Sequence, residues 1–472
     1  MTGPLAVVSN EVVNLMYVVA AILFVVGIKR LSSPTTARSG NVLAAVGMVL
    51  AVVFTILLPE VAHYWLIAAG LAVGTVVGLV AARQVKLTAM PQMVAVFNGL
   101  GGGASVLVAV SEYRRLAPPD GALAGDILGA ALFSALIGAI TFSGSLVAFA
   151  KLQELMPGRP LTFVGQQALN GLLLVGALAA GIGAGVAEET VWVYALVVVA
   201  LALGVLFVLP IGGADMPVVI AFLNAFSGLS AVGAGFVLSN TALIIGGTLV
   251  GASGTFLTVI MSRAMNRSLA NVLFGAFGAP AAADAGVGAA ASEDGKSYRE
   301  VDAEDCAVML AYASRVVIVP GYGLAVAQAQ HNVRELADLL ERRGVDVKYG
   351  IHPVAGRMPG HMNVLLAEAN VPYPQLRDME DINPELPRTD VALVIGANDV
   401  TNPAARDNPE SPLYGMPILN VDQATNVVVL KRSMSPGFAG IDNDLFYRPN
   451  TAMLFGDAKA SVERLVTAVK AA

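Results

Sequence analysis

The segment Val316-Ile-Val-Pro-Gly-Tyr-Gly-Leu-Ala-Val-Ala327 could bind a phosphate-bearing ligand. It joins an apolar run typical of a buried strand to a glycine turn and a stretch that predicts a helix. Gly321 would permit a tight turn, Gly323 would let the backbone approach a pyrophosphate, and the helix N-terminus would favour the anion. Val326 stands where the dinucleotide fingerprint has Gly or Ala. The motif therefore predicts a dinucleotide site only together with other residues.

The residues that follow a second apolar run indicate which dinucleotide this is. Lys431-Arg432-Ser433 directly follows Val427–Leu430, and two cations with a hydroxyl suit a 2′-phosphate. NAD sites instead tend to place an acidic residue at the end of the second strand. Here that strand ends Val347-Lys-Tyr-Gly350, without a carboxylate at its tip. A solvated basic pair is the alternative, but the strand-end position favours NADP(H).

Three further segments look suited to a ligand because they combine Gly and Pro with polar side chains. Residues 350–362 contain Arg357, a candidate pyrophosphate contact, and residues 434–440 could form a lid over the nucleotide. Another apolar run is followed by three candidates, namely Gly396, Asn398 and Asp399. The histidines of this half lack recognisable zinc spacing, so no metal site is predicted.

Apolar runs that alternate with helical segments must position these residues. The clearest strands are Val316–Val319, Val345–Tyr349, Val391–Ile395, Val427–Leu430 and Met453–Phe455. Such alternation implies a soluble α/β, Rossmann-like domain over residues 301–472, with a mainly parallel sheet and a crevice at the strand carboxyl ends.

The first half of the chain has the composition of a membrane-spanning domain. Charged residues are 13% of the whole, against about 25% in soluble domains, and they are sparse before residue 295. A spanning helix needs about 20 mainly apolar residues. Nine stretches qualify: 12–28, 41–58, 64–82, 91–110, 122–150, 166–186, 190–210, 216–238 and 241–262. We therefore expect a helical polytopic bundle over residues 1–264, followed by a flexible linker at 265–300 that is rich in Ala and Gly.

Basic residues predict the orientation of the bundle. With the N-terminus outside, only Arg114 and Arg115 lie on the outer side. The cytoplasmic side then receives Lys29, Arg30, Arg38, Arg83, Lys86, Lys151, Arg159, Arg263 and Arg267. This bias, and an odd number of spans, place the C-terminal domain in the cytoplasm, where the single free cysteine, Cys306, is expected.

Polar residues inside the spans form three short stripes. They are Asn98 with Ser105 in the fourth span, Asn224 with Ser227 in the eighth, and Ser134, Thr141 and Ser145 in the fifth. Polar groups in lipid are costly and usually face the bundle interior. They could simply hydrogen-bond the helices together, or they could converge to make a wet path for protons.

Two titratable residues are candidates for handling a proton. His63 precedes the third span, and its unperturbed pKa near 6.5 would suit proton exchange, although a solvated histidine at the outer interface is also ordinary. Asp215 lies in the turn between the seventh and eighth spans. It is either a turn carboxylate or a relay that faces the soluble domain.

Several motifs together resemble the beta subunit of proton-translocating NAD(P) transhydrogenase. The resemblance covers nearly the whole chain. It rests on Pro320-Gly-Tyr-Gly-Leu-Ala-Val-Ala-Gln328, Gly350-Ile-His-Pro-Val-Ala-Gly-Arg357, Gly396-Ala-Asn-Asp399, Lys431-Arg-Ser-Met434, Gly456-Asp-Ala-Lys459, Gly212-Gly-Ala-Asp-Met-Pro217 and Ala264-Met-Asn-Arg-Ser268.

The resemblance implies a division of labour. NADP(H) would bind this chain and NAD(H) a separate alpha subunit or subunits, with hydride passing between the nicotinamides while a proton crosses the membrane. It also implies a dimer of alpha–beta units in the inner (cytoplasmic) membrane, and no nucleic-acid partner. By resemblance, Arg357 binds near the pyrophosphate and Asp399 lies by the nicotinamide. Lys431, Arg432 and Ser433 take the 2′-phosphate, while the nucleotide is held by Gly321, Tyr322, Gly323, Ala325 and Val326.

The chain departs from the family pattern at two positions. Some members carry a histidine at the position of Asn98, and Asn cannot titrate. Protons would then pass through His63 or along water beside Asn98, Ser145 and Asn224. The lid aromatic, often Tyr, is Phe438. A competing hypothesis is an NADP(H)-sensing channel or transporter without hydride transfer.

Overall fold

The computed structural model describes most of the chain. The described residues are 9–58, 63–85, 89–116, 125–157, 160–187, 189–212, 215–264, 269, 297–358, 360–411, 413–437 and 439–471. Most of the predicted linker, residues 265–300, lies outside them, as do Phe438 and part of the Ala264–Ser268 motif. Residues through Val259 belong to one compact unit and residues from 297 onward to a second. Each unit is described by itself.

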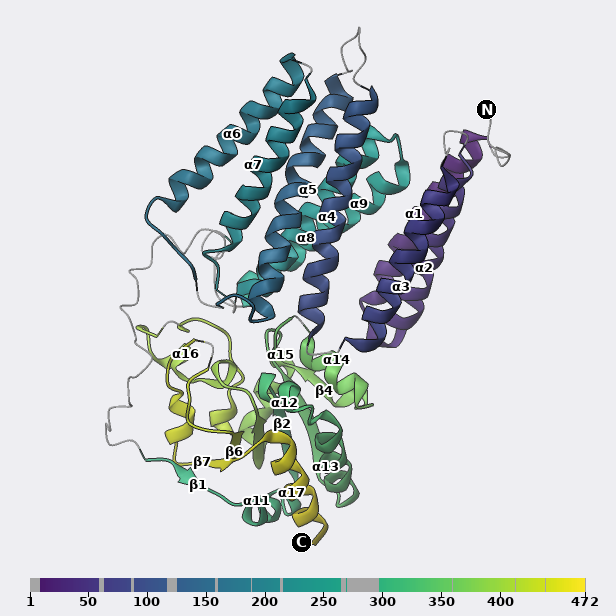
Figure 1. Ribbon diagram of the computed structural model, residues 1–472. Coiled ribbons are helices and arrows are strands. Elements are labelled where there is room, and N and C mark those ends of the chain that lie inside the picture. The colour runs from purple at the N-terminus through teal and green to yellow at the C-terminus, as the bar shows by residue number, and fades with distance from the viewer. Residues whose placement is uncertain are drawn as a thin grey trace. The chain divides into compact units, whose positions relative to one another are not determined.

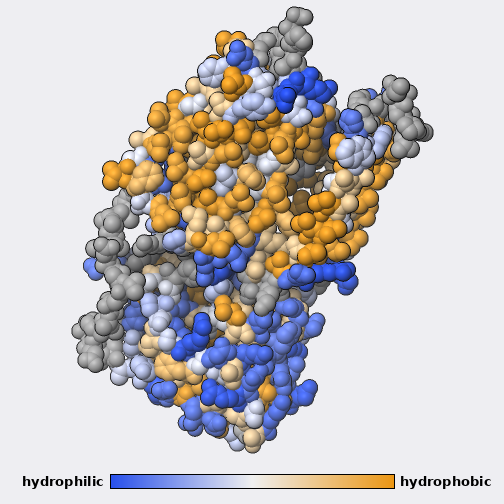
Figure 2. Space-filling view, viewed as in Figure 1, coloured by the Kyte–Doolittle hydropathy of each residue, from blue (hydrophilic) through white to orange (hydrophobic). Residues whose placement is uncertain are grey.

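The N-terminal unit is a bundle of long apolar helices (Figure 1). The nine predicted spans are confirmed within the described residues, each as a helix long and apolar enough to cross a membrane. They are α1 (Asn10–Leu31), α2 (Pro34–Ile56), α3 (Tyr64–Gln84), α4 (Met90–Leu116), α5 (Gly125–Leu152), α6 (Gln166–Ala187), α7 (Thr190–Val208), α8 (Met216–Val237) and α9 (Thr241–Ala264). Hydrophobic residues cover the visible face of these helices (Figure 2), as lipid contact requires.

Small residues let the central helices of this bundle approach closely. α5 packs against α4, α7 and α8. A Cβ at Gly102 would lie 2.7 Å from the carbonyl oxygen of Gly138, and one at Gly228 would lie 2.2 Å from the amide nitrogen of Gly251. Such backbone contacts replace the hydrophobic effect as the source of helix association in lipid. Gly102 and Gly228 therefore serve helix packing.

The C-terminal unit is built on one sheet of seven parallel strands. These are β1 (Arg299–Glu300), β2 (Arg315–Pro320), β3 (Asp346–Ile351), β4 (Leu376–Asp378), β5 (Val391–Ile395), β6 (Asn426–Lys431) and β7 (Thr451–Phe455). Their order is β1-β7-β6-β5-β2-β3-β4, and every pair is parallel. The predicted Rossmann-like fold is confirmed. The apolar runs did not reveal β1 and β4, because these short edge strands bury little side-chain surface.

Both faces of the central strands are buried, which explains why they read as continuous apolar runs. On one face, α13 (Gln330–Arg342) and α11 (Ala303–Ala311) pack beside α17 (Ala458–Ala471). The other face carries a core that includes Val317, Val394 and Val429 and closes over Leu419 and Phe446. The shorter helices are α12 (Tyr322–Ala327), α14 (His361–Glu368), α15 (Met379–Ile382) and α16 (Ala404–Asp407).

The contact between α8 and α9 gives a test of the bundle. Gly228→Ala should destabilise it, because the new methyl group would also meet the carbonyl oxygen of Gly247 at 2.6 Å, and overpacking costs about 1–3 kcal/mol. We expect a clear fall in the temperature at which the purified chain loses its monodisperse peak in size-exclusion chromatography. Gly246→Ala, where nothing lies within 4 Å of the added Cβ, is the control and should change little. Equal effects of the two variants would contradict the packing argument.

Candidate functional site

The sheet order places a topological switch point between β2 and β5, and the region outside the carboxyl ends of these two strands is called the crevice below. Strand order reverses at this point, since β3 and β4 continue to one side and β5, β6 and β7 to the other. In open α/β sheets, ligands bind outside the strand carboxyl ends at such a switch point. The glycine turn that follows β2 lies there, as the sequence predicted.

Three glycines bring the backbones together at the switch point. The amide of Gly321 donates to the carbonyl of Ile395 at 2.9 Å, and that of Gly323 donates to Gly396 at 2.9 Å. A Cβ at Gly321 would lie 2.3 Å from the amide nitrogen of Ala397, and one at Gly323 would lie 2.7 Å from the Cα of Gly396. Gly396 itself has a φ of 69°, which disfavours any other residue. The close approach seen at these glycines is therefore between the loops that follow β2 and β5, whereas the sequence predicted an approach of the backbone to a pyrophosphate.

The helix after the glycine turn is short. α12 ends after six residues because Gln328 adopts a left-handed conformation, with a φ of 52°, and α13 begins at Gln330. Ala325 is buried in α12, whereas Val326 is 45% exposed. Exposure at Val326 explains why a side chain larger than Gly or Ala is tolerated at the third fingerprint position.

The loop after β3 brings Arg357 to the glycine turn. The guanidinium of Arg357 lies 4.6 Å from the ring centroid of Tyr322, a cation–π distance. Its backbone amide donates to Nδ1 of the buried His361 at 3.0 Å. Burial and the charge of Arg357 lower the pKa of His361. His361 is therefore neutral and orients the loop, while Arg357 supplies the positive charge.

His352 marks the actual end of β3, which is longer than predicted and continues to Ile351. No carboxylate occupies residues 350–352. His352 is 1% exposed, and one of its ring nitrogens lies 2.8 Å from the carbonyl oxygen of Pro417. Burial lowers the pKa of His352 to about 4, so this residue carries no charge near neutral pH.

Asn398 and Asp399 follow β5 and contact the segment predicted to be a lid. The amide of Ala439 donates to Oδ2 of Asp399 at 2.9 Å. A Cβ at Gly437 would lie 2.4 Å from Oδ1 of Asp399, so a side chain there would force the Asp399 carboxylate to move. The side-chain nitrogen of Asn398 is buried without a hydrogen-bond partner in the described chain. A buried donor of this kind is the group that a ligand or a water would satisfy.

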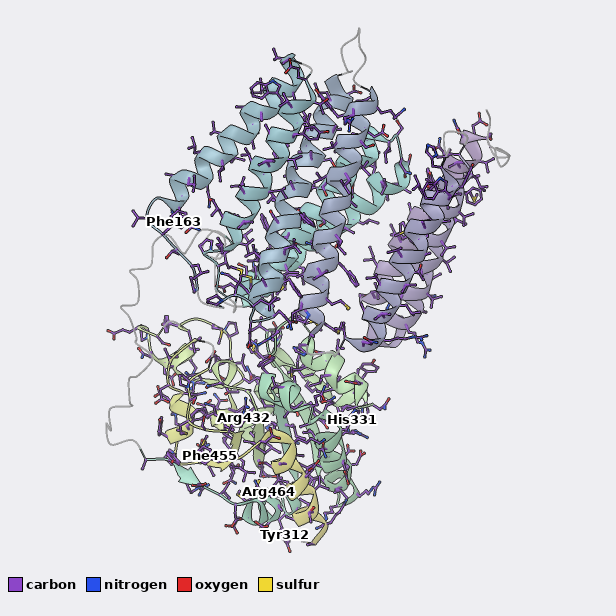
Figure 3. The ribbon with its side chains drawn as sticks, viewed as in Figure 1. Phe163, Tyr312, His331, Arg432, Phe455 and Arg464 are labelled. Atoms are coloured by element: carbon purple, nitrogen blue, oxygen red, sulfur yellow. The ribbon has the colours of Figure 1, made fainter. Side chains whose placement is uncertain are left out.

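Lys431 is the last residue of β6, one residue further than the predicted strand end, and Arg432 and Ser433 follow the strand. Lys431 pairs in register with Phe455 of β7, and Figure 3 shows Arg432 and Phe455 close together at these strand ends. The Lys431 ammonium donates to the carbonyl of Ser435, and burial lowers its pKa against the opposing effect of Asp399 and Asp442. Arg432 and Ser433 are exposed and can therefore reach an incoming anion.

The polar stripes of the spans converge at Asn98. Its side-chain nitrogen donates to the hydroxyl of Ser145 at 3.0 Å, and its Oδ1 accepts from the hydroxyl of Ser227 at 2.7 Å. These bonds join α4, α5 and α8, and Asn98 is 8% exposed. The polar stripes therefore do hydrogen-bond the helices together, which is one of the two alternatives given for them.

A second polar group lies further along the same helices. The hydroxyl of Ser230 is 3.2 Å from that of Ser105, and Ser134 donates to the carbonyl of Ser230 at 2.9 Å. Among the described residues, Thr141 bonds only within its own helix, to Ile137. Asn224 is half-buried and makes no hydrogen bond to a described residue. The serines and Asn98 thus form a polar seam between α4, α5 and α8.

The two titratable candidates lie outside this seam. His63 is exposed and precedes α3, a helix without a buried residue, and no hydrogen bond joins it to Asn98 or the serines. Asp215 is the N-cap residue of α8 and is 9% exposed. Its side chain does not bond to the first-turn amides of α8.

Two buried asparagines that the sequence did not point to hold the chain just after the predicted lid, at Asp442 and Asn443. Asn402 donates to the carbonyl of Asp442 at 3.0 Å. Asn443 donates to both the carbonyl and Oδ1 of Asn398 at 3.0 Å. Both lie in loops, where asparagine is common for local reasons, so their positions along the chain gave no signal.

His352 gives a prediction about pH. Its pKa is near 6.5 in an unfolded chain and about 4 in the fold, so the unfolded state binds more protons between these values. Stability should therefore decrease as the pH falls from about 6.5 to 4, by about 3 kcal/mol at most. Hydrogen exchange of the β3 and β5 amides in the whole chain measures this. In His352→Gln, the slope of stability against pH should decrease by one proton, whereas in the exposed His331→Gln it should stay as in the wild type. The same slope in both variants would contradict the prediction.

Comparison with known proteins agrees with this geometry. The family model described as NAD(P) transhydrogenase beta subunit matches residues 13–468. Two relatives from Rhodospirillum rubrum, both named NAD(P) transhydrogenase subunit beta, are 50% identical to the chain over 458 residues. The matches cover 96% of this chain and 98% of each relative. The chain therefore belongs to the NAD(P) transhydrogenase beta subunit family, as its motifs predicted.

Proposed function

We propose that the crevice between β2 and β5 binds NADP(H). The observation that carries the proposal is the pair of exposed polar residues Arg432 and Ser433 after β6. In addition, β3 ends without a carboxylate. A 2′-phosphate needs cations, whereas the free 2′-hydroxyl of NAD usually meets an acid. Lys431, already held near Ser435, adds to the positive charge.

The remaining crevice residues suit the other parts of the cofactor. Arg357 beside Tyr322 would balance the pyrophosphate charge above the turn formed by Gly321 and Gly323. The unpartnered side-chain nitrogen of Asn398 would bond to the ligand near Asp399. Ala325, Val326 and Gly396 shape the adjoining surface. The bound cofactor would supply a nicotinamide ring that accepts or gives a hydride; the protein's part is to hold and orient it.

The hydride partner would lie on another subunit. Within the described residues, the sheet offers a single switch point. We propose that NAD(H) binds an alpha subunit, that this chain is inactive in transhydrogenation without it, and that two alpha–beta units form a dimer. Residues 1–264 would be the translocating domain and residues 301–472 the NADP(H) domain, joined by a linker at 265–300.

The polar seam is the proposed route for the proton. Asn98 cannot titrate, so transfer there would use water held by Asn98, Ser145 and Asn224, with Asp215 as a relay near one end. His63 is the other candidate carrier. One charge moving through 100 mV supplies about 2.3 kcal/mol, which biases an equilibrium about fifty-fold. Such a bias would favour NADPH formation through proton flow inward.

The basic residues favour an inner-membrane protein with its N-terminus outside and its C-terminal domain in the cytoplasm. This orientation puts the nucleotide crevice in the compartment where NADP(H) and the alpha subunit would be available. The linker would let the domain move between open and closed states, with the Asp215 turn and the lid segment transmitting the change.

Reconstitution tests the proposal. The chain and an alpha partner in vesicles, given NADH and an NADP analogue, should transfer hydride and move protons together. Transfer without proton movement would overturn coupling, and no transfer would favour the NADP(H)-sensing channel or transporter. In the same vesicles, a His63→Ala variant with normal proton movement would remove that residue from the route.

Arg432 tests the choice of cofactor. Arg432→Gln should weaken NADPH binding to the whole chain about 10- to 100-fold, because a charge-assisted bond contributes about 1.5–3 kcal/mol, and should leave the weaker binding of NADH unchanged. Titrations that follow the nicotinamide fluorescence of NADPH and, separately, of NADH measure the two affinities. Arg388→Gln is the control, since Arg388 is exposed before β5, at the opposite edge of the sheet. An equal loss for NADPH and NADH would argue against a 2′-phosphate contact.

A further inference from the structure

Lys151 is a buried cation that the proposed function does not use. It lies in the last turn of α5 and is only 2% exposed. Its ammonium donates to the carbonyl of Leu209 and, at 2.7 Å, to that of Ile211. Lys151 forms no ion pair with a described residue. A buried charge without a counter-ion is costly, so the two carbonyls must stabilise it.

The carbonyls lie at and just after the C-terminal end of α7, and the Leu209 carbonyl also accepts the backbone amide of Leu161 at 3.2 Å. Val208 is the last residue of α7 and Leu209 its C-cap. Carbonyls at a helix C-terminus carry partial negative charge and favour a cation. The partial negative charge of the carbonyls therefore explains how the Lys151 ammonium can be buried. It does not explain why a charged side chain is used here, when a neutral amide could donate the same hydrogen bonds.

Neutral amides perform the same task elsewhere at this end of the bundle. The side-chain nitrogen of Gln92 in α4 donates to the carbonyl of Leu152 at 3.1 Å, and that of Gln166 in α6 donates to Leu206 at 3.2 Å. Both glutamines are buried. Hydrogen bonding alone thus does not require a charge here, and Lys151 differs from its two neighbours in this respect.

The position of Lys151 connects two parts of the proposed proton route. Six residues before it on α5, Ser145 accepts the hydrogen bond from Asn98. On the other side, Ile211 lies four residues before Asp215, whose backbone amide donates to the carbonyl of Gly212 at 3.0 Å. Leu152 and Ile211 pack in one apolar cluster with Met216, the first residue of α8. A shift of α5 would therefore move the start of α8 through Lys151.

We propose that Lys151 is a positioning residue that ties α5 to the turn before Asp215, so that its ammonium keeps the polar seam and Asp215 in one arrangement during proton transfer. The role needs a cation that binds both carbonyls at once. An arginine can provide this, and a methionine of similar length cannot. The inference rests on the proposed function, because it takes Asp215 as part of the proton route.

The test uses the complete alpha–beta complex in vesicles, with protons moved per hydride as the readout. Lys151→Met should lower this ratio at least fivefold in correctly assembled complex, while the KM for NADPH stays unchanged. Lys151→Arg should restore most of the ratio. Gln92→Met, which removes a neutral cap at the same end, is the matched control and should keep the wild-type ratio even if it lowers the yield.

The outcomes separate the two claims. Wild-type complex that transfers no hydride would overturn the proposed function itself. Wild-type complex that couples normally, together with a Lys151→Met variant of unchanged ratio, would overturn only the role of Lys151. The same would follow if Gln92→Met lowered the ratio as much as Lys151→Met, since a general loss of helix capping would then explain both. If Lys151→Met does not assemble, the ratio of Lys151→Arg decides: a fivefold loss there contradicts the proposal, and retention supports it.

Discussion

The close contact between the loops that follow β2 and β5 is the constraint on which the proposed nucleotide site depends. Gly323 and Gly396 approach so closely that a Cβ on either would lie within 2.7 Å of the other's backbone. Because no side chain separates the two loops, the strand carboxyl ends present their backbones and following residues at one place. Arg357 and Asn398 follow β3 and β5, and Lys431 ends β6; these strands lie on both sides of the switch point in one parallel sheet. Strand order and glycine geometry together therefore direct their loops toward the same edge of the sheet.

The membrane unit uses the same device for a different purpose. At Gly228 and Gly251 the missing side chains let α8 and α9 approach, in a solvent where burial of apolar surface gives no driving force. Close backbones then bring short polar side chains within reach across the bundle, as between Asn98 and Ser227. The contact between Gly102 and Gly138 likewise brings together α4 and α5, two of the helices that carry the polar seam.

Buried polar groups in the two units are satisfied in a consistent way. In the soluble unit, Asn402 and Asn443 bond to loop carbonyls and fix the chain just after the predicted lid. In the membrane unit, the side-chain nitrogens of Gln92, Gln166 and Lys151 bond to carbonyls at the ends of helices. Each replaces water that the backbone would otherwise need. These residues tie neighbouring segments together, so that such segments keep their arrangement relative to one another.

Much of this protein could be predicted from the sequence, because its strongest signals are local. Runs of about 20 apolar residues must be helices in lipid, so the nine spans followed from composition. Buried parallel strands such as Val391–Ile395 read as continuous apolar runs, and the glycine turn after β2 carried its own signature. Edge strands bury little, so Arg299–Glu300 and Leu376–Asp378 were not predicted.

Only the tertiary structure decided which polar residues meet. The bond from Asn98 to Ser145 spans 47 residues and that from Lys151 to Ile211 spans 60. Such pairings depend on which helix faces pack together, and hydropathy along one chain does not determine that.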